Sequence, residues 1–180
     1  IRQAHITYFD KVPAGCDSKR TWRGEAAVFL KTEKLTIRKM TTEDLFPLYH
    51  VLSDPEVMEY LEPPFSMEAA KQFLYKAGIC ETPLIWAVED ARKVFIGYVI
   101  YHTYDETSME LGWVLERKEW GKGYASAITK VVTEESGSSG KELVIECSPE
   151  QKATKRIAQK YGFQFCSVVN GCEVYRLRRK

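Results

Sequence analysis

Two glycines separated by one residue lie between a predicted strand and a predicted helix, in the run Trp120-Gly-Lys-Gly-Tyr-Ala125. Glycine lets the backbone turn tightly and lets a ligand approach the amide groups, because it has no Cβ. The free N–H groups at the start of the following helix, with the positive end of its dipole, favour an anion such as a phosphate or diphosphate. Lys118 and Lys122 add positive charge. The run therefore indicates a phosphate site, and a tight strand-to-helix turn without a ligand is the alternative interpretation.

Two common phosphate-binding motifs do not match this run. A dinucleotide-binding fingerprint requires a third glycine or alanine where this chain has Ser126. A P-loop requires four residues between its glycines and then Lys-Ser or Lys-Thr, which the run lacks. The predicted phosphate site is therefore of another type.

The elements that position this turn are predicted from apolar periodicity. Strands are predicted over residues 35–38, 84–89, 93–103, 108–115, 143–145, 163–169 and 172–177. Helices are predicted over residues 41–52, 54–61, 66–77, 123–135 and 150–161. Pro47 is expected to kink the first helix or delay its start, and Asn170-Gly171 predicts a hairpin between the last two strands. The strand–helix–strand unit over residues 108–147 predicts a parallel strand pair, because such crossovers are right-handed.

These elements predict an α/β (α+β) fold, in which a mixed and mostly antiparallel central sheet carries helices on both faces. A chain of 180 residues suits one domain. We expect residues 34–180 to form that domain and residues 1–33 to be an N-terminal extension of unknown role.

Composition narrows the class of protein. The chain has 26 Lys and Arg against 25 Asp and Glu, and this balance argues against a general nucleic-acid binder. No apolar run approaches the roughly 18–20 residues of a membrane span. The five cysteines include no Cys-x-x-Cys pair, which argues against a zinc site and a disulfide framework. From this use of cysteine we expect a cytoplasmic protein with reduced thiols.

An ordered set of short motifs resembles the GNAT superfamily of N-acetyltransferases, and most closely its branch of ribosomal-protein N-terminal alanine acetyltransferases. The motifs are Lys34–Arg38, Leu52–Tyr60, Glu110–Leu115, Trp120–Ala125 and Lys160–Phe163. The resemblance covers the chain from Lys34 to Lys180. It implies the GNAT acyl-CoA N-acyltransferase fold, with acetyl-CoA as cosubstrate and no metal.

The resemblance also implies which residues bind the cosubstrate. It assigns the diphosphate of acetyl-CoA to Trp120, Gly121, Lys122, Gly123, Tyr124 and Ala125. It places the backbone of Trp113, Val114 and Leu115 beside the pantetheine arm, in a cleft between this strand and the strand at 143–147. On the last helix, Gln151 and Thr154 stand where relatives usually carry Asn and then Ala or Ser, and both can hydrogen-bond the arm. Ala158 stands where many relatives carry a tyrosine that acts as general acid.

Acetyl transfer requires a neutral amine, and a lysine-like amine with a pKa near 10.4 is almost wholly protonated at neutral pH. A general base is therefore expected, and Glu110 is the candidate. In the strand 108–115 it shares one face with Gly112 and Val114, where a ligand has room to lie. A solvated or salt-bridged glutamate is the alternative interpretation. The N–H group of Val114 is a candidate for stabilising the oxyanion.

Other reactive side chains are less strongly indicated as catalytic or acceptor-binding groups. Cys147 ends a strand near the expected thioester, so an acetyl-cysteine relay is conceivable, but a buried free cysteine is the simpler explanation. The histidines are dispersed and predict neither a triad nor a metal site; His102 is at most a minor catalytic candidate. The acids between residues 54 and 62 suit a cationic amine or form a solvated helix face.

We therefore expect an acetyl-CoA-dependent N-acetyltransferase acting on a primary amine, either a peptide N-terminus or a small molecule, by direct transfer in a ternary complex. The alternative is a non-catalytic acyl-CoA-binding sensor or interaction module, which Gln151 and Ala158 support. A plain nucleotide-phosphate binder is a third and weaker hypothesis. No nucleic-acid or membrane partner is expected, and both a monomer and a homodimer are compatible with the sequence.

Overall fold

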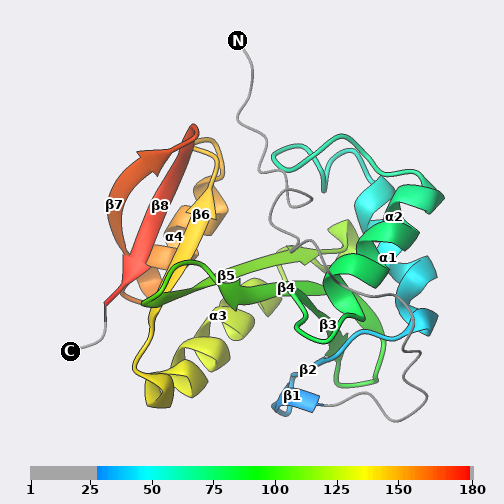
Figure 1. Cartoon of the computed structure of the whole chain (residues 1–180), viewed down its shortest axis with the longest axis horizontal. Coiled ribbons are helices and arrows are strands. Elements are labelled where there is room, and N and C mark those ends of the chain that lie inside the picture. Colours follow the sequence, from blue (N-terminus) through cyan, green and yellow to red (C-terminus); the bar gives the residue numbers. More distant parts are fainter. Residues whose placement is uncertain (1–27, 179–180) are drawn as a thin grey trace.

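The computed structural model describes residues 28–178, in which eight strands form one twisted sheet (Figure 1). The strands lie in the order β1-β2-β3-β4-β5-β6-β8-β7. Their bounds are Val28–Lys31, Leu35–Arg38, Ile85–Asp90, Phe95–Thr103, Ser108–Leu115, Glu142–Cys147, Gln164–Val169 and Cys172–Leu177 for β1 to β8. Only β5 and β6 pair in parallel, and all the other neighbours are antiparallel. The predicted mixed, mostly antiparallel sheet is confirmed.

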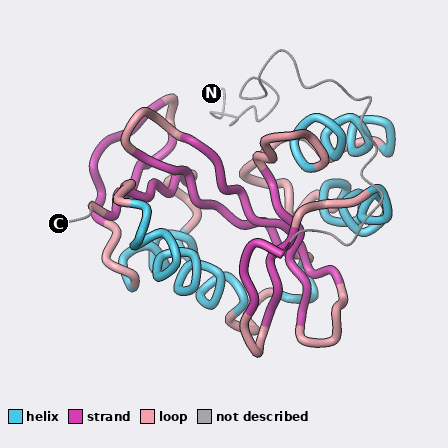
Figure 2. The backbone as a smooth tube through the Cα atoms, turned by 60° about the horizontal axis from the view of Figure 1, so that its bottom comes forward, coloured by secondary structure: helices cyan, strands magenta, loops and turns pink. Residues whose placement is uncertain are grey.

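Four α-helices cover the two faces of this sheet (Figures 1 and 2). They are α1 (Leu45–Ser53), α2 (Met67–Phe73), α3 (Tyr124–Glu135) and α4 (Lys152–Lys160). One apolar core packs α1 and α2 against Tyr98, Ile100 and Val114. A second core packs α3 and α4 against the opposite face, where Leu111 and Leu143 are fully buried. The two cores thus follow the alternation of side chains along each strand.

The start of α1 explains how Pro47 is accommodated. A single 3-10 turn, Thr42–Asp44, precedes the helix, and Thr41 and Asp44 form a reciprocal capping box around it. Because α1 begins at Leu45, Pro47 lies in the first turn, where backbone N–H groups have no intrahelical acceptor. The proline therefore delays the start of the helix and does not break it.

The helix predicted over residues 54–61 is absent, and a series of turns replaces it. Asp54 has an extended backbone that ends α1, and its side-chain oxygen Oδ1 accepts a hydrogen bond from the N–H of Glu56 at 2.9 Å. Such a local bond competes with helix formation. Val57 and Met58 are nevertheless buried in the core shared with α1 and α2, so tertiary packing holds the loop in place.

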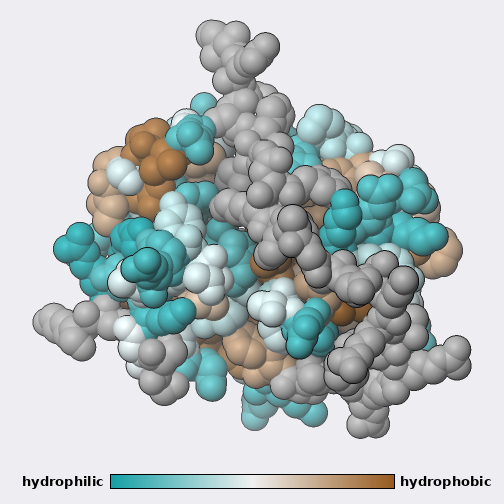
Figure 3. All heavy atoms as spheres, viewed as in Figure 1, coloured by the Kyte–Doolittle hydropathy of each residue, from teal (hydrophilic) through white to brown (hydrophobic). Residues whose placement is uncertain are grey.

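The predicted hairpin is confirmed at the sheet edge. Asn170 and Gly171 both have positive φ, 50° and 83°, as the preferred two-residue hairpin turn requires. Phe165, Val168 and Val169 of β7 are among the exposed large apolar side chains of the described residues. In the space-filling view, apolar atoms accordingly gather over this hairpin (upper left in Figure 3).

β1 lies in the segment predicted to be an extension, and it pairs with β2 through Leu30 and Lys31. The sheet therefore begins before Lys34. The apolar run at residues 6–9, which is compatible with a further strand, lies outside the described residues.

The parallel pair β5–β6 is short. Its register joins Ser108, Met109 and Glu110 to Glu142, Leu143 and Val144, and it ends there. Beyond Glu110, β5 continues alongside β4, whereas β6 continues alongside β8. The two strands therefore separate and leave an opening in the middle of the sheet.

A buried ion-pair network ties the first helix to the sheet. The guanidinium of Arg38 donates to both carboxylate oxygens of Asp44 at 2.8 Å, and its Nε donates to Glu89 at 2.7 Å. Asp44 also accepts the N–H of Thr41 at 2.8 Å. Removal of Asp44 would break two charged hydrogen bonds to Arg38 and the capping bond from Thr41, and would leave Glu89 as the remaining charged partner of the partly buried Arg38.

We therefore expect Asp44→Ala to lower the free energy of unfolding by about 3 kcal/mol, measured by urea denaturation. Glu43→Ala is the matched control, because Glu43 lies in the same turn but is exposed. Equal and small losses for the two variants would show that the network contributes little.

Candidate active site

A cavity of about 600 Å³ occupies the opening between β5 and β6. Its walls come from the end of β5, the glycine turn, the first turn of α3, the first half of α4 and the loop at 56–61. It is lined by the predicted cosubstrate-binding residues Trp113, Val114, Leu115, Trp120, Gly121, Gly123, Tyr124, Ala125, Gln151 and Thr154. Segments far apart in sequence thus meet at one site, as the resemblance led us to expect. Lys122 and Glu110 are not among its lining residues.

The glycine turn has the geometry expected of an anion site. Gly121 and Gly123 have φ values of 74° and 80°, in the left-handed region that side chains rarely adopt. A Cβ placed on Gly121 would meet no atom within 4 Å, so the space beside this residue is open. Gly123 is the N-cap of α3 and has no side chain to occupy the first N–H groups of the helix. These amides are available to a ligand that enters the cavity.

The charges around the turn differ from the expectation. Lys118 forms an ion pair with Glu116, and Lys122 forms one with Glu119 at 3.0 Å, so both predicted cations are neutralised locally. A different cation reaches the turn: Lys34 Nζ donates to the carbonyl of Lys122 at 2.9 Å and lies 5.0 Å from the ring centre of Tyr124. Sequence reasoning missed Lys34, because only the folded sheet brings the β1–β2 connection to the start of α3.

Along β5, the backbone N–H and C=O groups of successive residues face opposite neighbouring strands. Glu116 donates its N–H to Ile96 at 2.9 Å, on the β4 side, so Val114 points its N–H toward β4 as well. The carbonyl of Val114 also faces β4, where a Cβ on Gly97 would meet it at 2.2 Å. The N–H group of Val114 therefore belongs to the β4 ladder and does not face the opening. The backbone groups of Trp113 and Leu115 face it instead.

Glu110 lies at the point where β5 and β6 separate, and only 2% of its surface is exposed. His102 on β4 is its register partner, and His102 Nε2 lies 3.4 Å from Glu110 Oε2. His102 Nδ1 lies 2.9 Å from the carbonyl oxygen of Thr103, which can only accept, so Nδ1 carries the hydrogen. Glu110 is on the face of β5 that carries Val114, as predicted from alternation.

A second buried polar pair lies on the same side. The hydroxyl of Tyr104 donates to Glu146 on β6 at 2.5 Å. Burial, reinforced by this bond to a carboxylate, raises the pKa of Tyr104, so its proton stays in place at neutral pH. The opening is therefore bordered by two glutamates, Glu110 and Glu146, on neighbouring strands.

Other candidate side chains have structural partners. Cys147 is buried, and burial raises the pKa of its thiol to about 12, which argues against an acetyl-cysteine relay. Gln151 accepts the N–H of Ser148 at 2.8 Å. The hydroxyl of Tyr161 lies 2.8 Å from Ser126 Oγ, and its ring packs on the second core. Asp54 and Glu56 both pair with Arg117, so one positive charge is shared between these two acids.

The described residues 28–178 contain no group of His, Cys, Asp and Glu side chains that could hold a metal ion. None of the helices in that range is long and apolar enough to cross a membrane.

A family model described as an acetyltransferase (GNAT) domain matches residues 34–164, which is more than half of the chain. The chain therefore belongs to the GNAT acetyltransferases, and it is an acetyl-CoA-dependent acyltransferase. The predicted fold family and cosubstrate are confirmed.

Curated and solved relatives agree with this assignment. An uncharacterized N-acetyltransferase, YnaD of Bacillus subtilis (strain 168), is 30% identical over 142 residues, covering 75% of this chain and 82% of its own. A GNAT-family acetyltransferase structure from Bacillus anthracis has a TM-score of 0.75 at 24% identity, covering 83% and 97% of the two chains. The spermidine N-acetyltransferase of Vibrio cholerae, solved with CoA and spermine, has a TM-score of 0.66 at 19% identity, covering 81% and 94%.

The expected closeness to ribosomal-protein acetyltransferases is not established. RimL, an acetyltransferase of ribosomal L7/L12 solved with coenzyme A, has a TM-score of 0.69 but only 15% identity, covering 84% and 98% of the two chains. A likeness at this level concerns the fold alone.

The glycine turn yields a direct test. We expect Gly121→Ala to weaken CoA binding by about tenfold or more, because the added Cβ would occupy the open space through which a phosphate approaches the backbone amides, and one lost hydrogen bond to a charged group costs about 1.5–3 kcal/mol. Binding is measured by isothermal titration calorimetry.

Gly140→Ala is the matched control. Gly140 also has a positive φ, 69°, and a Cβ there would likewise meet no atom within 4 Å, but Gly140 does not line the cavity. Both variants should lose about 1 kcal/mol of stability from backbone strain. Similar CoA affinities for the two variants would contradict the assignment of the turn.

Proposed function

We propose that this enzyme transfers the acetyl group of acetyl-CoA directly to a primary amine, either a peptide N-terminus or a small-molecule amine, with Glu110 as general base. One observation carries the proposal: the buried carboxylate of Glu110 lies at the last register pair of β5 and β6, and the cavity is lined by Trp113, Val114 and Leu115 farther along the same strand. We further propose that the transferase domain comprises residues 34–180 together with β1, which pairs with β2.

The residues of the cavity suit acetyl-CoA. The open amides at Gly121 and Gly123 match the diphosphate, since anions bind at helix N-termini. The backbone groups of Trp113 and Leu115 face the opening and match the amides of the pantetheine arm. Trp120 keeps this wall in place, because its indole Nε1 donates to the carbonyl of Leu115 at 3.0 Å. Bound acetyl-CoA supplies an activated thioester, so this chain need only orient it and handle protons.

Glu110 accepts a proton from the incoming ammonium, which converts it into a nucleophilic amine. His102 packs beside this carboxylate, with its Nε2 3.4 Å from Glu110 Oε2. The N–H groups of Trp113 and Leu115, and not that of Val114, are the strand amides that point toward the opening and can polarise the acetyl oxygen. Ala158 supplies no proton, so we propose that water protonates the leaving sulfur.

The class of acceptor is part of this proposal. RimL acts on a protein N-terminus, and the Vibrio cholerae enzyme is named for spermidine, so chains of this fold serve both kinds of amine. An α-amine has a pKa near 8 and an alkyl amine a pKa near 10.4. The activity should therefore depend more strongly on the Glu110 carboxylate with alkyl amines than with α-amines. Because Asp54 and Glu56 already pair with Arg117, the loop at 54–62 provides less free negative charge for a polyamine than its sequence indicates.

The non-catalytic sensor is not favoured by the relatives, whose names identify them as N-acetyltransferases. A panel of peptides with free N-termini, polyamines and free amino acids separates the two hypotheses. Release of free CoA thiol with any one acceptor supports catalysis, and CoA binding with no turnover on the panel would support the sensor.

With the best acceptor from that panel, we expect Glu110→Gln to lower kcat/KM by about 100-fold or more well below the pKa of the amine. The loss should shrink as the pH approaches that pKa, because a growing fraction of the amine is then neutral without a base. A pH series of kcat/KM for both proteins provides the measurement.

The acetyl-CoA affinity of Glu110→Gln should match that of the wild-type enzyme, which separates a catalytic defect from a folding defect. Glu134→Gln, on the exposed side of α3, serves as the control for loss of one surface carboxylate. A constant ratio of wild-type to Glu110→Gln activity across the pH series would exclude Glu110 as the base.

A further inference from the structure

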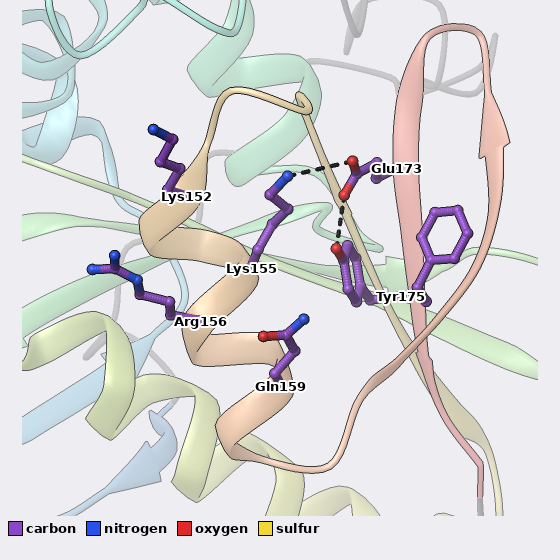
Figure 4. A pocket seen from close by; sticks show the side chains of 7 residues that line it. Lys152, Lys155, Arg156, Gln159, Glu173 and Tyr175 are labelled. Carbon is purple, nitrogen blue, oxygen red and sulfur yellow. Dashed lines mark hydrogen bonds and ion pairs between the residues drawn. The ribbon is translucent and has the colours of Figure 1, made fainter.

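A row of cations lies along α4 beside the cavity. Lys152, Arg156 and Lys160 are four residues apart, so they occupy one stripe of the helix. Ala153 and Ile157, in the adjacent stripe, line the cavity. In the close-up, Lys152 and Arg156 point to the same side of α4, away from β8 (Figure 4). Lys152 lines the cavity itself, and Arg156 lines the adjoining groove between α4 and the β7–β8 hairpin.

The charges of this row are not used within the described part of the chain. Lys155, on another stripe, pairs with Glu173 at 3.3 Å, and Tyr175 donates to the same carboxylate at 2.7 Å (Figure 4). The groove between α4 and the β7–β8 hairpin thus contains a satisfied network. By contrast, no acidic group among residues 28–178 forms an ion pair with Lys152, Arg156 or Lys160.

Two ammonium groups reach the first turn of α3 from opposite directions. Lys160 Nζ donates to Ser126 Oγ at 3.1 Å, and Lys34 Nζ donates to the carbonyl of Lys122 at 2.9 Å. Both lysines are exposed and bind neutral oxygens, which are weaker acceptors than phosphate oxygens. Lys118 and Lys122 each pair with a glutamate. Lys34 and Lys160 are therefore the lysines near the turn that remain able to pair with an anion.

We propose that Arg156 and Lys160 bind the 3′-phosphate of acetyl-CoA and that Lys34 binds its diphosphate, so that the chain discriminates against CoA lacking the 3′-phosphate. This inference rests on the proposed position of acetyl-CoA in the cavity. Lys34 contacts the glycine turn itself, where the diphosphate is proposed to lie. Lys160 contacts Ser126, which lines the cavity at the start of α3, and Arg156 lies one helical turn before Lys160 on α4.

The charge of the 3′-phosphate favours its assignment to Arg156 and Lys160. A phosphate monoester carries about 1.5 to 2 negative charges at neutral pH, more than backbone amides alone neutralise. The guanidinium of Arg156 can bind two phosphate oxygens at once, and the ammonium of Lys160 adds a point charge. Removal of the 3′-phosphate would leave both without an anionic partner.

The test compares CoA with dephospho-CoA, which lacks only that phosphate, by isothermal titration calorimetry on the full chain. The wild-type protein should bind CoA at least about tenfold more tightly than dephospho-CoA, as expected for charged hydrogen bonds. The double variant R156A/K160A should bind the two ligands equally, by losing CoA affinity while keeping its affinity for dephospho-CoA. Lys34→Ala should weaken both ligands by the same factor, and Lys34→Arg should restore much of the loss.

Lys130→Ala controls for the removal of a positive charge. Lys130 lies on α3, the helix that follows the glycine turn, but it pairs with Glu134 at 3.9 Å. It should leave both affinities unchanged. Raising the salt from about 0.05 M to about 0.5 M should reduce the discrimination of the wild-type protein, since screening weakens exposed ion pairs.

The outcomes separate this inference from the proposed function. Equal binding of CoA and dephospho-CoA by the wild-type protein, or undiminished discrimination in R156A/K160A, would overturn the inference while leaving the transferase activity in place. Failure of the wild-type protein to bind either ligand would overturn the proposed position of acetyl-CoA itself.

Discussion

The early end of pairing between β5 and β6 is the constraint on which the rest of the molecule depends. These strands share only three register pairs, the last of which joins Glu110 to Val144. Each strand then continues with its other neighbour, so the sheet remains continuous while its middle opens. Backbone groups of β5 that face this opening lack a strand partner, and such groups require hydrogen bonds from elsewhere. The opening is thus both a gap in the sheet and a row of binding groups.

The helix that connects the two strands aligns the phosphate site with this opening. α3 begins directly after β5, and a right-handed crossover brings it along one face before β6 returns in parallel. Its first turn therefore lies at the mouth of the opening, next to α4 and the β1–β2 connection. The buried glutamate lies at the other end. In the function we propose, a ligand anchored by its phosphates at the mouth extends along β5 toward Glu110.

Much of this arrangement follows from local sequence. The faces of β5 were predicted from alternation, and the hairpin at Asn170-Gly171 follows from the backbone preferences of those two residues. The helix expected over residues 54–61 does not form, because the side chain of Asp54 accepts the backbone N–H of Glu56 and burial of Val57 then holds the turns in place. The direction of the Val114 N–H group also could not be predicted, since it depends on which neighbouring strand each residue faces.

By itself, the sequence determined most of the elements and their order, the glycine turn and the placement of Glu110 on the face of Val114, because these depend on contacts between residues near in the chain. Only the tertiary structure decided which charges remain available. Lys118 and Lys122, which are prominent in the sequence, are neutralised by adjacent glutamates, whereas Lys34 reaches the turn from a connection 88 residues away in the chain. Electrostatic interactions act through space, so the position of a charge along the chain does not determine its partner.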